Sequence, residues 1–127
     1  MYIMKLLIFS LLVIVQYLMD RFTSTCATYT GEVLLFLHHI MAVYIYCGPM
    51  FFDPFYHLLF CVILLIHWHT YKACIVTKWT NYYCGVDMNR PFHDYVRLLK
   101  LYKIYEYIHW HMIYILIIYD VCLIWNK

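Results

Sequence analysis

Four apolar runs separated by short polar connections dominate the chain. They cover residues 1–19, 33–47, 55–69 and 107–125, with few polar side chains inside any of them. Helices that are apolar on every side are buried in protein or in lipid. The pattern therefore predicts an all-α chain with four principal helices.

The connection at residues 48–54 carries helix-ending and helix-starting signals. Gly48-Pro49 is expected to end the second helix, because proline cannot continue the hydrogen-bond ladder. Pro54 suits the first turn of the next helix, where its missing N–H costs nothing. Since the connection is short, we expect the second and third helices to form an antiparallel hairpin.

The first run resembles a signal peptide, with Lys5, an apolar stretch and small residues at 24–27. An uncleaved membrane helix is the favoured interpretation, because further apolar runs follow. Thr30 or Gly31, followed by Glu32, can open the second helix. A hydroxyl accepts from free N–H groups there, and an acid suits the positive helix end.

Composition indicates what surrounds these helices. Hydrophobic residues make up 66% and charged residues 13% of the 127 residues, and the mean hydropathy is +0.70; soluble domains have roughly 45–50% and about 25%. These values exclude a disordered chain, a coiled coil and an ordinary soluble enzyme, since a small soluble domain needs a large polar surface. We predict one integral membrane domain, residues 1–127, built as a four-helix bundle that crosses the bilayer three or four times. Its approximate spans are 3–19, 33–49, 55–71 and 105–125.

The second and third runs are marginal spans. Each has about 15 residues, whereas a membrane-spanning helix needs about 20. Flanking residues can extend both runs to the required length. The alternative is a soluble or peripheral protein that buries its apolar runs against a partner.

Residues 70–104 combine a polar loop with an amphipathic segment. From about His93, cationic residues recur among leucines and tyrosines in a pattern typical of a basic helix at a membrane surface. No helix breaker separates this segment from the fourth run, so we expect one helix that starts at the interface and continues into the last span. The residues expected to contact headgroups or a partner are Lys72, Lys78, Arg90, Arg97, Lys100 and Lys103.

Basic residues also predict an orientation. With four spans, the loops at 20–32 and 70–104 share one side and carry seven Lys and Arg residues, whereas the other side carries Lys5 and Lys127. Because cytoplasmic loops are enriched in Lys and Arg, both termini should face away from the cytosol. The net charge of +2 is too small for a nucleic-acid-binding surface.

Histidine is the most unusual candidate for chemistry. All of the eight histidines except His93 lie in or beside the apolar runs, and polar groups at membrane depth are functional candidates. His57 and His67 are about three helical turns apart, so we expect them to share a face. Hydrogen bonding between helices explains these residues without a ligand, so we predict no cofactor and no metal. If a haem or quinone were bound between helices, its residues would be His38, His57, His67 and His109.

The cysteines lie within or beside apolar runs, where a thiol usually behaves as a small hydrophobic group. Cys74 and Cys84 could form a disulfide or share a metal with His67 or His69. However, their spacing is wide for a zinc pair, and the expected cytosolic side is reducing. We therefore expect free thiols.

No catalytic motif is recognisable. The chain has no Gly-x-Ser-x-Gly, no glycine-rich phosphate loop and only seven acidic residues. Asp94 beside His93 is better explained as an acid at a helix N-terminus, and Asp120 as a residue at the far membrane interface. We predict that the chain is not an enzyme and takes no small-molecule substrate.

A short motif extends over residues 57–99, within a resemblance that covers roughly residues 57–125. It comprises His57, His67-Trp68, Cys74-Ile75-Val76-Thr77, Phe92-His93-Asp94-Tyr95 and Arg97-Leu98-Leu99. This arrangement resembles small membrane proteins of the nucleocytoplasmic large DNA viruses, in which a His-rich span ends in His-Trp and a basic helix leads into a last span. The resemblance implies a virion inner-membrane or minor capsid component, in agreement with a composition typical of an AT-rich genome.

These observations predict a non-catalytic structural membrane protein that anchors a larger assembly to the bilayer. Its expected partners are lipid and other subunits of a capsid or membrane complex. The expected location is a virion inner membrane, with a mitochondrial or other organelle membrane as the alternative. The alternative function is a small anchor subunit of a redox complex that binds haem or quinone.

Overall fold

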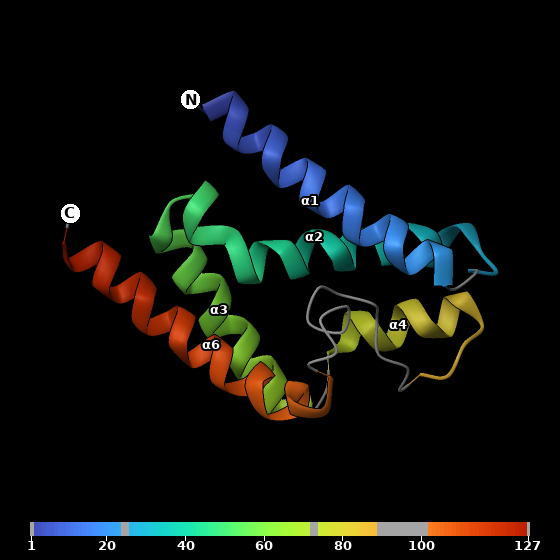
Figure 1. Ribbon diagram of the computed structural model, residues 1–127. Helices are drawn as coiled ribbons and strands as arrows, with labels where there is room; N and C mark the ends of the chain where they lie inside the picture. Colours follow the sequence, from blue (N-terminus) through green and yellow to red (C-terminus); the bar gives the residue numbers. More distant parts are fainter. Residues whose placement is uncertain (1, 24–25, 72–73, 89–101, 127) are drawn as a thin grey trace.

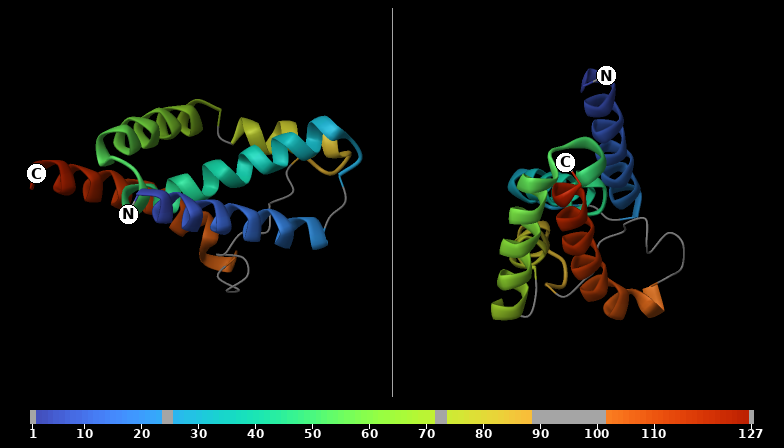
Figure 2. Two further views of the ribbon diagram at one scale, coloured as in Figure 1. Left: turned by 90° about the horizontal axis from the view of Figure 1, so that it is seen from above. Right: turned by 90° about the vertical axis from the view of Figure 1, so that its left-hand side faces the viewer.

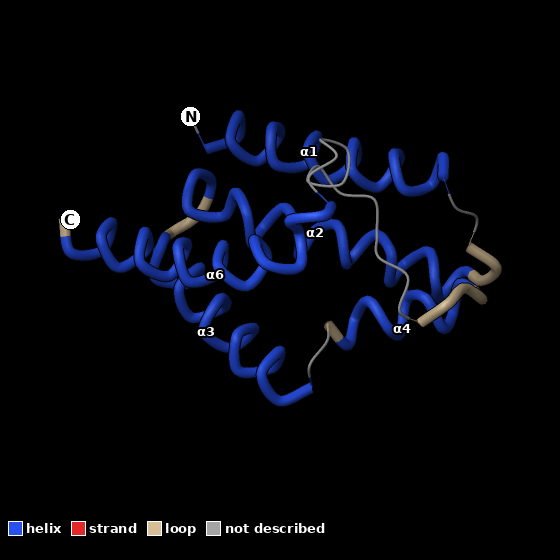
Figure 3. The backbone as a smooth tube through the Cα atoms, turned by 60° about the horizontal axis from the view of Figure 1, so that its bottom comes forward, coloured by secondary structure: helices blue, strands red, loops and turns tan. Residues whose placement is uncertain are grey.

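The computed structural model describes residues 2–23, 26–71, 74–88 and 102–126, with side chains described outside 102–110. These residues form five helices and no strand (Figure 3), which confirms the all-α prediction for the described part of the chain. The helices are α1 (Tyr2–Thr23), α2 (Tyr29–Phe51), α3 (Pro54–Tyr71), α4 (Ile75–Cys84) and α6 (Tyr102–Trp125).

Helix α2 is the centre of the arrangement (Figure 1). Helices α1 and α4 pack along it, and α3 leads away from its end to pair with α6, which runs antiparallel to α3. The expected α2–α3 hairpin is therefore only a short contact near the turn, and α4 covers more of α2 than α3 does. Both chain termini lie at the same end as the α2–α3 turn, opposite the α1–α2 connection (Figure 2).

Two small apolar cores lie on different sides of α2. Phe9 and Val13 of α1 pack against Val43 of α2. The second core joins α2, α3 and α6 and consists of Ile45, Leu64, Trp68, Ile113 and Leu116. In lipid such contacts gain little from the hydrophobic effect, because the tails are as apolar as the side chains. Polar interactions between the helices, described below, add to the packing of these cores.

Two helices, α1 and α2, are long and apolar enough to cross a membrane. Helix α3 qualifies as a candidate span only together with α4, from which it is bent by 69°. The described apolar part of α6, His111–Trp125, is shorter. The described chain thus has two candidate spans, or three if the bent pair forms one, and the predicted four-helix membrane bundle is not confirmed.

The ends of α2 differ from the sequence-based prediction. The N-cap is Thr28, not Thr30 or Gly31, and its hydroxyl oxygen accepts a 3.0 Å hydrogen bond from the Gly31 N–H. At the other end, Gly48-Pro49 does not stop the helix, which continues to Phe51. Proline is tolerated there because only one carbonyl loses its partner, and that carbonyl is satisfied from outside the helix, as described below.

Helix α4 was not predicted, because its residues lie in the polar stretch treated as a loop. Its buried side chains include Thr80 and Asn81, so a polar face packs against the protein. The helix ends at Gly85, whose φ of +70° closes it in the left-handed conformation. Most of the predicted amphipathic segment lies outside the described residues. Within them, α6 is one uninterrupted helix from Tyr102.

Candidate functional site

The candidate site is a buried contact between α3 and α6. The His57 imidazole Nδ1 lies 2.6 Å from Asp120 Oδ2, and both side chains have no exposed surface. Burying a charged group in an apolar interior is costly unless it is paired. Asp120, which its sequence position suggested as a residue at a membrane interface, is thus the buried partner of His57 on α3.

The other ring nitrogen of His57 is held by the backbone of α2. His57 Nε2 lies 3.0 Å from the Ile45 carbonyl oxygen and 3.1 Å from that of Tyr44. Pro49 follows Ile45 by four residues and has no N–H, so it leaves this carbonyl without its helical donor. Nε2–H donates in its place.

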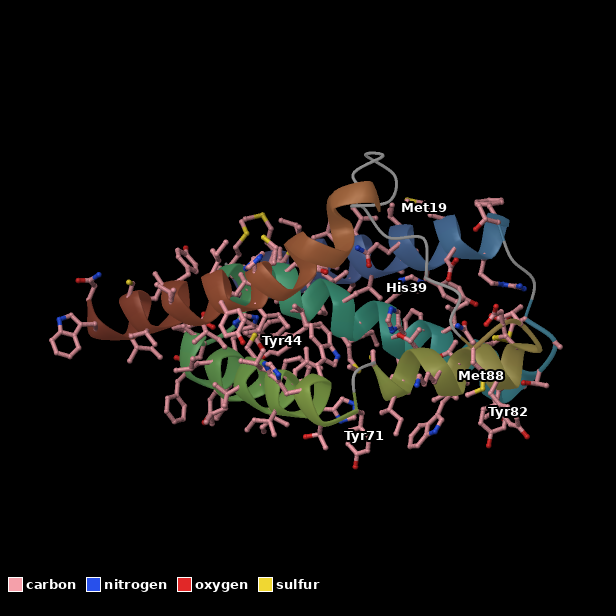
Figure 4. All side chains as sticks on the ribbon, turned by 90° about the horizontal axis from the view of Figure 1, so that it is seen from below. Met19, His39, Tyr44, Tyr71, Tyr82 and Met88 are labelled. Atoms are coloured by element: carbon pink, nitrogen blue, oxygen red, sulfur yellow. A yellow bond between two sulfur atoms is a disulfide. The ribbon has the colours of Figure 1, made fainter. Side chains whose placement is uncertain are left out.

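Gly48 provides the space for this contact. A β-carbon at position 48 would lie 2.8 Å from His57 Nε2 and would collide with the ring carbon beside it. Only glycine therefore lets the imidazole reach the α2 backbone. The ring of Tyr44, which is labelled in Figure 4, also packs against His57, with the two ring centroids 5.3 Å apart.

Cys61 lies one helical turn beyond His57 on α3. Its Sγ is 3.8 Å from Nδ1 and 3.6 Å from Nε2 of His57, and its side chain is fully buried. The second carboxylate oxygen of Asp120, Oδ1, is buried and has no hydrogen-bond partner among the described residues. The site thus places a nitrogen, a sulfur and a carboxylate oxygen close together.

A second buried Asp–His contact joins α1 to α2. Asp20 Oδ2 lies 3.5 Å from His39 Nε2, and both residues are buried. Nearby, Glu32 accepts a 2.8 Å hydrogen bond from the Tyr17 hydroxyl and pairs with Arg21 at 3.0 Å. Each of the two apolar helix pairs, α1–α2 and α3–α6, is therefore joined by one Asp–His contact.

A disulfide between Cys26 and Cys84 joins the start of α2 to the end of α4. The prediction of a free thiol at Cys84 is therefore wrong, whereas Cys74 is a free cysteine. Gly31 permits the bond, because a β-carbon there would lie 2.7 Å from Cys84 Sγ and collide with Cys26 Sγ. The same ends are also linked by the Thr28 hydroxyl, which donates to the Tyr83 carbonyl at 2.7 Å.

The histidines proposed as cofactor ligands contact different partners. His38 is half-buried on α2 beside His39, and His67 Nε2 accepts a 3.4 Å hydrogen bond from the N–H of Ile75. His57 is fully buried while His67 is half-buried, so the two differ in surroundings although they lie on one helix. Both ring nitrogens of His57 are already in hydrogen bonds. The His109 side chain lies outside the described part.

Of the predicted surface cations, only Lys78 has a described side chain. It is half-buried on α4, one helical turn before the exposed Tyr82, which is labelled in Figure 4. Lys103 lies on α6, but its side chain is outside the described part. The remaining residues of that prediction, Lys72, Arg90, Arg97 and Lys100, lie outside the described residues.

Comparison with known proteins identified no relative of this chain. No protein-family model matches the chain, and searches of the curated proteins and of the solved structures found no match.

Sequence reasoning did not single out Cys61 and Asp20 of these buried contacts, and it gave Asp120 a place at an interface with no histidine partner. A signal for them was present, because an acid inside an apolar run requires a partner and histidine is the abundant one here. Which histidine pairs with which acid depends on how the helices pack, and residue spacing does not reveal that.

Proposed function

We propose that this chain is a non-catalytic membrane subunit that anchors a larger assembly to a bilayer. The observation that carries the proposal is the apolar character of the outward helix faces. On α1 the exposed side chains occur at helical spacing over almost the whole helix: Ile3, Leu7, Leu11, Ile14 and Leu18. Similar exposed residues cover α3 and α6: Leu59, Ile63, Ile66, Ile115 and Ile118. An apolar surface of this extent is unfavourable in water and is suited to lipid or to apolar neighbouring subunits.

The placement of the polar groups supports a structural role. Both Asp–His contacts are fully buried between helices, where they connect elements of the chain to one another. In a bilayer such contacts add to the van der Waals packing through which helices associate. We infer that α3 with α4, and α6 with its preceding basic segment, complete a bundle of three or four spans.

The disulfide-linked end is the surface we assign to partners. Here α4 brings polar and aromatic side chains together with the α1–α2 connection, including Lys78 and Tyr82. An amphipathic helix beside a membrane can bind acidic headgroups or a neighbouring protein. The resemblance to viral membrane proteins makes a virion membrane the expected setting, with a mitochondrial membrane as the alternative.

Alkaline carbonate extraction tests the membrane assignment. Membranes from cells that make the full chain are washed at high pH and sedimented. The protein should stay in the pellet, because only detergent replaces the lipid around its apolar faces. Release into the supernatant would instead support a peripheral protein.

Site-directed photocrosslinking tests the anchoring role. A photoreactive residue is placed at Leu7 or Leu11 on the outward face of α1, and at Val13 of the buried face as a matched control. In native membranes, the outward positions should yield adducts with neighbouring proteins, whereas Val13 should crosslink only within the chain. The anchoring proposal is wrong if the outward positions yield lipid adducts alone and mild-detergent extracts contain only monomer. A Soret band in the purified protein would favour the redox alternative.

A further inference from the structure

The structure assigns a metal-binding capacity to the cluster of His57, Cys61 and Asp120, and we propose that it binds one divalent transition metal of the zinc type. Each residue offers one ligand atom, and these three atoms lie within 4.8 Å of one another. All three side chains are fully buried. The ligand set of nitrogen, thiolate sulfur and carboxylate oxygen is one that Zn²⁺ accepts.

The backbone of α2 determines which imidazole nitrogen is available. Nε2 faces two carbonyl oxygens, which only accept hydrogen bonds, so Nε2 carries a proton. Nδ1 is then the nitrogen that faces Asp120 and lies near Cys61. Histidines that bind metals usually donate their other N–H to a carbonyl or carboxylate in this way, which fixes the ring.

The contact between Nδ1 and Asp120 Oδ2 requires a cation. At 2.6 Å the two lone pairs would repel one another unless a proton or a metal ion lay between them. A proton serves only these two atoms and leaves Asp120 Oδ1 buried without a partner. A metal ion would use the carboxylate, the imidazole and the Cys61 thiolate together.

Charge balance favours a divalent ion. Without metal, the imidazole and the carboxylate share one proton and the Cys61 thiol keeps its own, so the site is neutral. Binding of M²⁺ expels both of these protons and leaves a neutral imidazole, one carboxylate and one thiolate, so the site is again neutral. A trivalent ion, or a monovalent ion that also displaced the thiol proton, would leave a net charge in an apolar interior.

The geometry requires only a small adjustment. Tetrahedral ligands on zinc lie about 3.3 Å apart, given bonds of about 2.0–2.1 Å. Nδ1 and Oδ2 must therefore separate by less than about 1 Å, and Sγ must move closer to Nδ1 than its present 3.8 Å. The fourth position is left to Asp120 Oδ1 or to a small exogenous ligand.

Cobalt provides a direct test with the full-length protein in detergent or nanodiscs, purified through a tag without histidines. The Cys26–Cys84 disulfide is retained, and Cys47, Cys74 and Cys122 are replaced by serine, so that Cys61 is the only free thiol. Addition of Co²⁺ should give tetrahedral d–d bands and a near-ultraviolet thiolate-to-cobalt charge-transfer band at one equivalent. Zn²⁺ should abolish both.

Cys61→Ser in that background should remove the charge-transfer band, and Asp120→Asn should weaken Zn²⁺ binding by at least about 100-fold. Circular dichroism checks that both variants keep their helix content. X-ray absorption of the zinc-loaded wild type supplies a measurement independent of folding: one sulfur and two or three nitrogen or oxygen neighbours are expected. Absence of the band in the parent protein, its survival in Cys61→Ser, or a zinc shell without sulfur would overturn the proposal and leave a proton at the site.

Discussion

At the residue scale, Gly48-Pro49 and His57 act as one unit. Proline removes a backbone donor from α2, glycine removes the side chain that would cover the freed carbonyl, and the imidazole supplies the replacement N–H. Gly48-Pro49 would usually end a helix. Here this pair makes the place on α2 where the His57 side chain of α3 binds. The loss of one helical hydrogen bond is thereby offset by a contact between helices.

Gly48→Ala should lower the free energy of unfolding by about 1–3 kcal/mol, because the new methyl group collides with the His57 ring. Unfolding in detergent micelles measures the effect, with the exposed position Val33→Ala on the same helix as the control. In a His57→Ala background the Gly48→Ala penalty should largely disappear, because the collision is gone. An equal loss of unfolding free energy in both backgrounds would show that Gly48 is not needed to leave space for the His57 ring.

Asp120→Leu should destabilise the protein by about 3 kcal/mol, since it leaves the His57 ring nitrogen buried without its partner. The double variant His57→Leu/Asp120→Leu should lose less than the sum of the two single changes, because it removes both members of the pair and leaves only the Ile45 carbonyl without its donor. Tyr119→Leu, an exposed neighbour on α6, is the control. Denaturant titration of Asp120→Leu, His57→Leu, the double variant and the control measures the coupling, and simple additivity of the two single changes would contradict a coupled pair.

At the element scale, hydropathy predicted the long helices and failed at the short one. Apolar runs indicated α1, α2, α3 and the described apolar part of α6, because such runs are helical wherever lipid or protein covers them. Helix α4 was missed because it has only 10 residues and buries the polar side chains of Thr80 and Asn81, so no long apolar run marks it. The pairing of Cys26 with Cys84 was equally hidden, since two cysteines separated by 58 residues meet only through tertiary packing.

The disulfide should stabilise the α2–α4 arrangement. Closing a loop between residues 58 apart restricts the unfolded chain and contributes about 4 kcal/mol in the chain-entropy treatment. Cys84→Ser should lose stability of this order, whereas Cys74→Ser, at the other end of α4, should not. Unfolding with and without reductant provides the measurement. Equal stability of the wild type with and without reductant would show that the bond contributes nothing.

At the scale of the whole molecule, charge and thiol chemistry predict opposite orientations. The excess of Lys and Arg places the end that carries the disulfide on the cytosolic side. Disulfides, however, persist in oxidising compartments and are rare in the cytosol. Both termini lie at the opposite end of the molecule (Figure 2). Finding on which side of the membrane the termini lie therefore distinguishes the two orientations.

We expect the orientation that the disulfide indicates, in which the termini face the reducing compartment. An epitope placed after Lys127 should be digested by protease added to the cytosolic side of sealed vesicles. Acid quenching followed by thiol alkylation should show Cys26 and Cys84 oxidised in the same preparation. A protected epitope together with alkylated Cys26 and Cys84 would instead support the orientation inferred from charge.

The disulfide also sets an order of events during synthesis. Cys26 precedes α2 and Cys84 ends α4, so the covalent ring formed by their bond contains three helices and excludes α6. The ring can close as soon as residue 84 is available to an oxidant, before α6 has left the ribosome. Asp120 would then dock last, onto an imidazole already oriented by α2, and a cut in the α2–α3 turn would leave both fragments tethered.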